Sequence, residues 1–150
     1  MKSFAKLNEK MRGELLALLA ALLWGIAPIL DKIALSNGVS IYTATIIRLI
    51  GAIVAIVAVS LMLNQMDLTG FDMKRICLLL IAGVIAGAIA MVFYYTALRI
   101  LGASRTVPLT AIYPMFTALF SVLFLGEHVS LRLVVGTVLI VVGIILVSEA

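Results

Sequence analysis

The chain has 150 residues, of which 65% are hydrophobic and only 12% are charged, and its mean hydropathy is +1.29. Soluble domains contain roughly 45–50% apolar and 25% charged residues, so this composition excludes an ordinary soluble core. The formal net charge of +4 comes from basic residues at the ends of apolar segments, which argues for topology signals and against a nucleic-acid partner. We expect an all-α integral membrane protein, a bundle of five transmembrane helices.

Residues 1–14 form a charged leader. Lys2, Lys6 and Lys10 share one helical face opposite apolar residues, a pattern typical of an amphipathic helix in the membrane interface. The apolar run that follows resembles a signal-peptide core, but Pro28 and four later apolar segments favour a retained first span over residues 15–35. The membrane domain is therefore expected to cover residues 15–150.

Two ionisable residues lie near facing ends of the first two spans. Trp24, Pro28 and Asp31 share one face of the first span, and a Ser-Asn-Gly turn at residues 36–38 leads to the second span over residues 42–63. Arg48 lies about two turns inside that span, at a depth similar to that of Asp31. A buried pair would neutralise both charges, although an arginine this close to a helix end can instead snorkel to the interface.

The third span, over residues 76–98, combines packing glycines with tyrosines. Gly83 and Gly87 have the Gly-x-x-x-Gly spacing that lets a neighbouring helix approach closely. Tyr94 and Tyr95 lie near the membrane side shared by Asp31, where they belong either to a site or to an aromatic interfacial belt.

The fourth span, over residues 106–125, carries a polar stripe. Its members fall on one helical face, namely Thr106, Thr110, Tyr113, Thr117 and Ser121. Pro114 cannot donate a hydrogen bond to the carbonyl of Thr110. These features favour a polar cavity or substrate path, whereas the alternative is that the hydroxyls bond their own backbone or pack against other helices.

The fifth span, over residues 131–148, is aliphatic, with Gly136 and Gly143 on one face, and we expect it to act as scaffold. The single histidine and the single cysteine cannot form a metal site by themselves. No nucleotide-binding loop or nucleophile–base pair occurs, so neither a cofactor, ATP-driven transport nor an enzyme is expected.

Motifs spread over nearly the whole chain after the leader carry a family resemblance. In order these are Trp24-Gly25, Lys32, Arg48, Tyr95-x-Ala97-Leu98, Pro114, Leu125-Gly126-Glu127, Gly136 and Gly143. Together they resemble one EamA repeat of the drug/metabolite transporter superfamily. The resemblance implies an inner-membrane carrier of amino acids, metabolites or drugs, often an exporter, whose typical members have two such repeats and ten helices.

One repeat implies a partner, because five helices are few to surround a solute and seal both sides. The alternatives are a half-size transporter working by alternating access, a subunit of a lipid-linked metabolite flippase, or a scaffold or regulatory subunit that moves nothing. No acidic residue lies in the middle of a span, which favours facilitated diffusion or weak coupling. Proton or cation coupling would have to use Asp31, Glu14 or Glu127.

Eight residues are predicted to converge on one substrate cavity near mid-membrane: Trp24, Asp31, Arg48, Tyr94, Tyr95, Thr110, Tyr113 and Thr117. Arg48 would attract an anionic group such as a carboxylate, and the aromatic rings would contact the apolar part of the solute. Four glycines are predicted to serve helix packing: Gly83, Gly87, Gly136 and Gly143.

The partner is predicted to be an inverted copy of the chain, giving an antiparallel homodimer, with a second five-helix chain as the alternative. Five-helix repeats in one chain must be inverted relative to each other, so a single-repeat chain rebuilds that arrangement only by inserting both ways. With the amino terminus inside, the inner basic residues are Lys2, Lys6, Lys10, Arg12, Lys74, Arg75 and Arg132, against Lys32, Arg48, Arg99 and Arg105 outside. Without the leader the tally is three against four, which sets almost no orientation.

Overall fold

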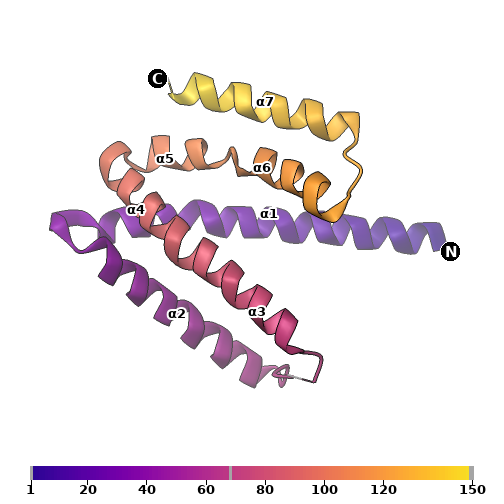
Figure 1. The fold of residues 1–150 in the computed structure, drawn as a ribbon, viewed down its shortest axis with the longest axis horizontal. Coiled ribbons are helices and arrows are strands. Elements are labelled where there is room, and N and C mark those ends of the chain that lie inside the picture. The colour runs from indigo at the N-terminus through magenta and orange to yellow at the C-terminus, as the bar shows by residue number, and fades with distance from the viewer. Residues whose placement is uncertain (1, 68, 149–150) are drawn as a thin grey trace.

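The computed structural model describes residues 2–67 and 69–148, and the side chains of residues 11–67 and 69–147. The described residues form helices joined by short connections, without a strand among them. The longer helices are α1 (Lys2–Ala34), α2 (Ile41–Met62), α3 (Met73–Ala82), α4 (Ala90–Leu101), α5 (Ala103–Thr110), α6 (Tyr113–Phe120) and α7 (Leu131–Ser148) (Figure 1). The short helical segments are η1 (Ser36–Gly38), η2 (Gly83–Ile89) and η3 (Ser121–Leu125).

Within the described chain, four apolar helical stretches are long enough to cross a membrane: Met11–Ala34, Ile41–Met62, Met73–Leu101 and Ala103–Leu125. A fifth apolar helix, Leu131–Val147, is shorter. This confirms the predicted all-α membrane fold with five apolar helices. The leader is continuous with the first span in α1, and the faces formed by its side chains up to Lys10 lie outside the described residues.

Local sequence explains where the helices begin and end. Asn37 and Gly38 adopt φ values of 58° and 76° in the predicted turn, a conformation that asparagine and glycine tolerate best. The Ser40 side chain then caps α2 by accepting from the amide of Thr43 at 3.4 Å. Asp72 caps α3 in the same way, accepting from the amide of Arg75 at 2.8 Å.

The third and fourth spans are not uniform α-helices. The third span runs from Met73 to Leu101 and passes through a π-helical segment, η2, which begins at Gly83 and contains Gly87. Glycine is a weak helix former, and π-helical turns are frequent at functional positions. The fourth span breaks at residues 111–112, just before Pro114 at the start of α6, because proline has no amide hydrogen to continue the ladder.

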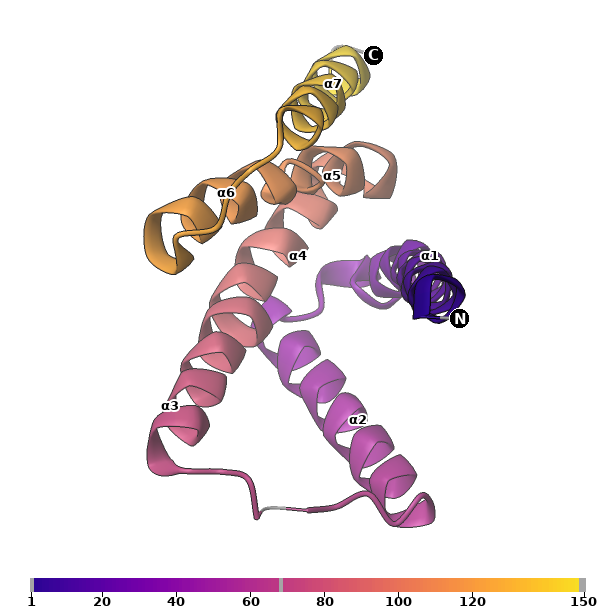
Figure 2. The same cartoon turned by 90° about the vertical axis from the view of Figure 1, so that its right-hand side faces the viewer.

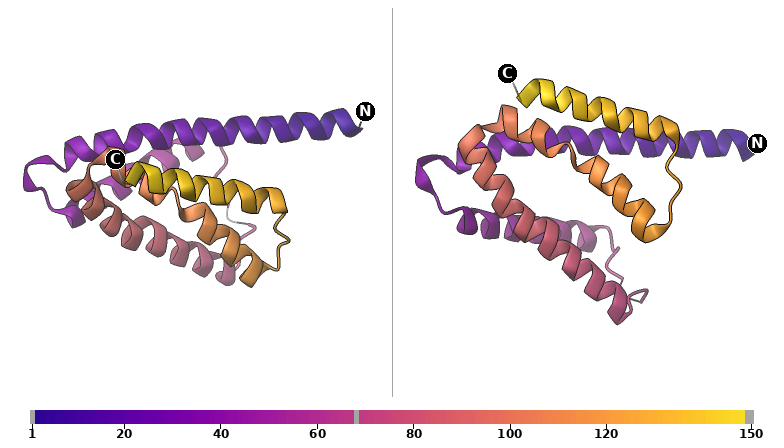
Figure 3. Two further views of the ribbon diagram at one scale, coloured as in Figure 1. Left: turned by 90° about the horizontal axis from the view of Figure 1, so that it is seen from above. Right: turned by 45° about the horizontal axis from the view of Figure 1, so that its top comes forward.

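The helices converge at one end and separate at the other. The end of α1, the start of α2, the end of α4 and the start of α5 gather on the left of Figure 1, and α2 and α3 spread apart toward their connecting loop in Figure 2. Two further views show α7 beside α5 and α6, and the first half of α1 extending past the other helices (Figure 3). The convergent end holds the small core formed by Leu35, Tyr95 and Leu98.

Most of the apolar surface is uncovered in the single chain. Within the most apolar stretch of each span, 6% of residues are buried in the first two spans and 0% in the third and fourth. In a bilayer this surface faces lipid or another protein chain, and helices associate there through close packing and polar contacts rather than the hydrophobic effect.

Candidate functional site

An ion pair and a hydrogen bond join three helices at the convergent end. Asp31 on α1 accepts a hydrogen bond from the Tyr95 hydroxyl on α4, with 2.7 Å between the two oxygens. The second carboxylate oxygen of Asp31 lies 3.9 Å from Nη1 of Arg48 on α2. The pair expected from the matching depths of Asp31 and Arg48 is therefore present.

Arg48 is held loosely. Its Nη1 donates to the thioether sulfur of Met91 at 3.0 Å, and its guanidinium carbon lies 6.0 Å from the centre of the Tyr95 ring. A thioether is a weak acceptor, and the Arg48 side chain remains 39% exposed, against 14% for Asp31. The arginine therefore retains N–H groups for a stronger, anionic acceptor.

Two further cations, Lys32 and Arg99, hold the helix ends beside the ion pair. Lys32 donates to the carbonyl oxygens of Leu98 at 3.1 Å and Arg99 at 3.4 Å, where its charge complements the carboxyl end of α4. The Arg99 guanidinium donates to the carbonyl of Val39, which joins α4 to the connection before α2. These contacts hold the backbone of three helices together beside Asp31.

Two polar atoms at this end of the molecule are buried without a hydrogen-bond partner among the described residues. They are Oδ2 of Asp31 and Oγ1 of Thr106, a residue only 1% exposed on α5. Most buried polar atoms are satisfied, so such exceptions are expected where a ligand or a proton binds.

The structure brings four of the eight predicted site residues together, namely Asp31, Arg48, Tyr94 and Tyr95; the two tyrosine rings lie 6.1 Å apart. Trp24 and Tyr113 are 67% and 58% exposed on the single chain. Thr110 and Thr117 are exposed and donate to carbonyls of their own helices, those of Val107 and Tyr113. A substrate role for all eight residues stays a prediction.

The predicted packing glycines differ in their surroundings. A Cβ atom on Gly87 would lie 3.4 Å from the side chain of Leu49, so η2 approaches α2 closely at this point. A Cβ atom on Gly83, Gly136 or Gly143 would meet nothing within 4 Å. A role in helix packing at those three positions stays a prediction.

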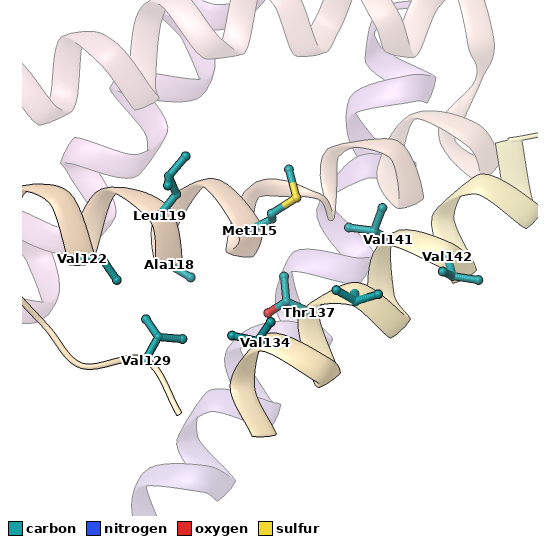
Figure 4. Close-up of a pocket in the computed structure, with 10 residues that line it drawn as sticks. Met115, Ala118, Leu119, Val122, Val129, Val134, Thr137, Val141 and Val142 are labelled. Atoms are coloured by element: carbon teal, nitrogen blue, oxygen red, sulfur yellow. The ribbon is translucent and has the colours of Figure 1, made fainter. Parts of the chain in front are cut away.

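Two apolar cavities lie away from the ion pair. One, of about 370 Å³, lies between α6 and α7 and is lined by side chains such as Met115, Leu119, Val134 and Thr137 (Figure 4). The other, of about 270 Å³, lies between α2 and the π-helical part of the third span, beside Thr45 and Leu49. Neither cavity is lined by a predicted site residue.

Sequence reasoning missed Met91 as a contact of Arg48 and missed the capping role of Lys32. Met91 lies four residues before Tyr95, on the same face of α4, so helical spacing could have placed it beside the tyrosine. Apart from this spacing, nothing about a methionine in an apolar span predicts a polar contact. The sequence identified Lys32 as a motif residue and as one of the outer basic residues, but it did not indicate that its side chain reaches the carboxyl end of α4.

Replacing Tyr95 by phenylalanine is expected to lower the thermal stability of the detergent-solubilised protein. The change leaves the Asp31 carboxylate without its hydrogen-bond donor, at a cost of about 1–3 kcal/mol. Tyr94→Phe is the matched control, because it removes a neighbouring hydroxyl and leaves the bond from Tyr95 to Asp31 intact. Equal melting temperatures for the two variants would contradict the assigned role of the Tyr95 hydroxyl.

These features together define a multi-pass α-helical membrane protein with an ion pair inside its convergent end. Residues 11–149 match the EamA-like transporter family, and the chain belongs to this family of membrane transporters in the drug/metabolite superfamily. The resemblance to one EamA repeat is thereby confirmed.

The chain is also similar to an uncharacterized protein of Methanocaldococcus jannaschii, MJ1333.1, with 31% identity over 134 residues. The alignment covers 89% of this chain and 94% of the archaeal protein, so that relative also has the length of one repeat. No solved structure matches the chain.

Proposed function

We propose that this chain is half of an inner-membrane transporter for small organic solutes with an anionic group, such as amino acids or other metabolites. Membership of a transporter family supports the general activity. The observation that carries the choice of site is the loose coordination of Arg48, whose donor goes to a thioether while Asp31 stays 3.9 Å away. A guanidinium in that state favours a carboxylate or phosphate, to which it can donate two parallel bonds.

The neighbouring tyrosines support an organic rather than an inorganic anion. Tyr94 and Tyr95 lie on α4 beside Arg48, and their rings offer apolar and polarisable surface to the rest of a solute. We infer that Trp24, Tyr113 and the threonines of the fourth span complete the pathway once a second chain is in place. The proposal also includes the mechanism, which is alternating access, and the activity, which is either export or facilitated movement of the solute.

The proposed working unit is an antiparallel homodimer. Its support is the uncovered surface of the four longer spans, the odd number of predicted spans and the near balance of basic residues once the leader is set aside. Two copies in opposite orientations would supply the ten helices of a two-repeat carrier. A heterodimer with a second five-helix chain is the alternative.

Flux into sealed liposomes that contain only the purified protein tests the proposal. We expect saturable movement of at least one labelled carboxylate from a panel of amino acids and aromatic acids, and none in liposomes without protein. A protein that moves no member of this panel, whether alone or with its inner-membrane partners, would instead be a scaffold or regulatory subunit.

A further inference from the structure

The ion pair between Asp31 and Arg48 leaves both partners short of bonds. Oδ1 of Asp31 accepts from Tyr95, whereas Oδ2 is buried and accepts no hydrogen bond among the described residues. The N–H group of Arg48 nearest to Oδ2 donates to Met91 instead. The pair is therefore held by charge attraction at 3.9 Å rather than by a bidentate bond.

Two neighbouring cations donate to backbone carbonyls rather than to the Asp31 carboxylate. Lys32, next to it on α1, donates to the carbonyls at the end of α4, and Arg99 on α4 donates to the carbonyl of Val39. The tyrosines of α4 supply hydroxyl groups and ring faces, and α5 brings Arg105 and the buried Thr106 to the same end of the bundle. Among the described side chains, Arg48 forms the ion pair with the carboxylate.

We propose that Asp31 takes up one proton from water when the anionic group of a solute binds Arg48, so that solute anion and proton occupy the site together. This inference rests on the proposed function and extends it from recognition of the anion to its coupling. In the step, an O–H bond of a hydronium ion in the surrounding water breaks, a new O–H bond forms on Oδ2 of Asp31, and the solute anion replaces the carboxylate as the counter-ion of Arg48. No electron is transferred, and the total charge of the site is unchanged.

The physical reason is competition between two anions for one guanidinium. If a solute carboxylate binds Arg48 while Asp31 stays ionised, the site holds two negative charges against one positive charge in surroundings of low polarity. Two such carboxylates cannot both remain ionised without a large cost, whereas protonation of one restores neutrality. Oδ2 is the atom ready to receive the proton, because Oδ1 already accepts from Tyr95.

The structure distinguishes Asp31 from Glu14 and Glu127, the other two acidic residues that the sequence suggests for proton coupling. Glu14 lies seventeen residues earlier on α1, about 25 Å away along the helix, and Glu127 is exposed in the connection after η3. Asp31 shares a cation with the proposed anion site. Under this proposal, electroneutral movement of an anion with a proton would replace the facilitated diffusion or weak coupling that the lack of an acid in the middle of a span favours.

The pH dependence of benzoate binding to the reconstituted full-length protein tests the inference. If one proton is taken up with the anion, the apparent Kd of benzoate rises about tenfold for each unit of rise in pH above neutrality. Asp31→Asn, which resembles the protonated acid, should bind benzoate with a Kd that is independent of pH. Glu14→Gln is the control acid and should keep the wild-type slope.

A measurement without a solute tests the same step and does not depend on the choice of benzoate. Arg48→Gln removes the counter-ion, so Asp31 should be protonated at neutral pH and show the infrared band of a carboxylic acid, which Arg48→Lys should lack. The band should vanish in Arg48→Gln/Asp31→Asn.

The outcomes separate the two proposals. Binding of benzoate with a Kd that does not vary with pH in the wild type would overturn the coupling and leave anion recognition standing. An ionised Asp31 in Arg48→Gln would overturn the coupling as well. Absence of any binding by benzoate or acetate to the wild type would overturn the anion site at Arg48, and the coupling with it.

Discussion

Arg48→Ala is expected to lower carboxylate flux in proteoliposomes by about a hundredfold or more. The arginine is the proposed donor to the solute, and loss of one partner of a charge-assisted contact of this kind costs about 2–5 kcal/mol. Since each 1.4 kcal/mol corresponds to about a factor of ten in affinity, a hundredfold loss requires about 2.8 kcal/mol, which lies within this range. Initial rates of labelled solute uptake at a fixed protein-to-lipid ratio measure it.

Three variants make this result interpretable. Arg132→Ala removes an exposed arginine at the start of α7 and should keep most of the flux. Arg48→Lys keeps the charge but loses the planar fork of donors, so an intermediate flux is expected. Arg48→Ala/Asp31→Asn removes the unpaired carboxylate that the single change leaves behind, and should be folded yet slow. Wild-type flux in this double variant would contradict the role of Arg48.

The helices and their ends could be predicted because the signals are local. A span is recognised by its apolar length, and the turn at Asn37 and Gly38 and the caps at Ser40 and Asp72 depend on a few adjacent residues. The pairing of Asp31 with Arg48 followed from counting residues from a shared turn, because both helices are regular up to that turn.

The shape of the fourth span could be predicted only in part. The polar stripe assumed one helix of constant period, but the chain breaks at residues 111–112, so the faces of α5 and α6 are set independently. Pro114 predicted that the carbonyl of Thr110 would lose its hydrogen-bond donor. The size of the resulting break in the helix depends on how α5 and α6 pack. Thr110 and Thr117 bond their own helices, which is the local alternative that hydroxyls in membrane helices always have.

Apart from the pairing of Asp31 with Arg48, contacts between helices were beyond prediction from residue patterns. The bond from Arg48 to Met91 and that from Lys32 to the carboxyl end of α4 each depend on the crossing of two helices and on side-chain rotamers. Which of the two glycines meets α2 also depends on how the helices cross, and Gly87 rather than Gly83 meets Leu49. Residue spacing on an ideal α-helix does not predict how two helices cross.

Chains locked in opposite orientations are expected to transport only when they are present together. In an antiparallel homodimer each copy supplies one repeat of an inverted pair, and two copies with the same orientation cannot form it. Orientation can be set by charge, because without the leader the basic residues are nearly balanced, with three on one side and four on the other. Added lysines in the loop of residues 64–67 should fix the amino terminus inside.

The opposite form combines neutral replacements of Lys2, Lys6, Lys10 and Arg12 with added lysines in the turn of residues 36–40. Reporters at the carboxyl terminus verify each orientation, and flux is then measured for each form alone and for both together. Each form alone should fall to the background of empty liposomes, and the mixture should recover much of the wild-type flux.

The matched control adds Arg48→Ala to both locked forms, which should abolish the recovery while leaving both orientations unchanged. Full flux from one locked form alone would rule out the antiparallel homodimer, because a single orientation would then suffice for transport.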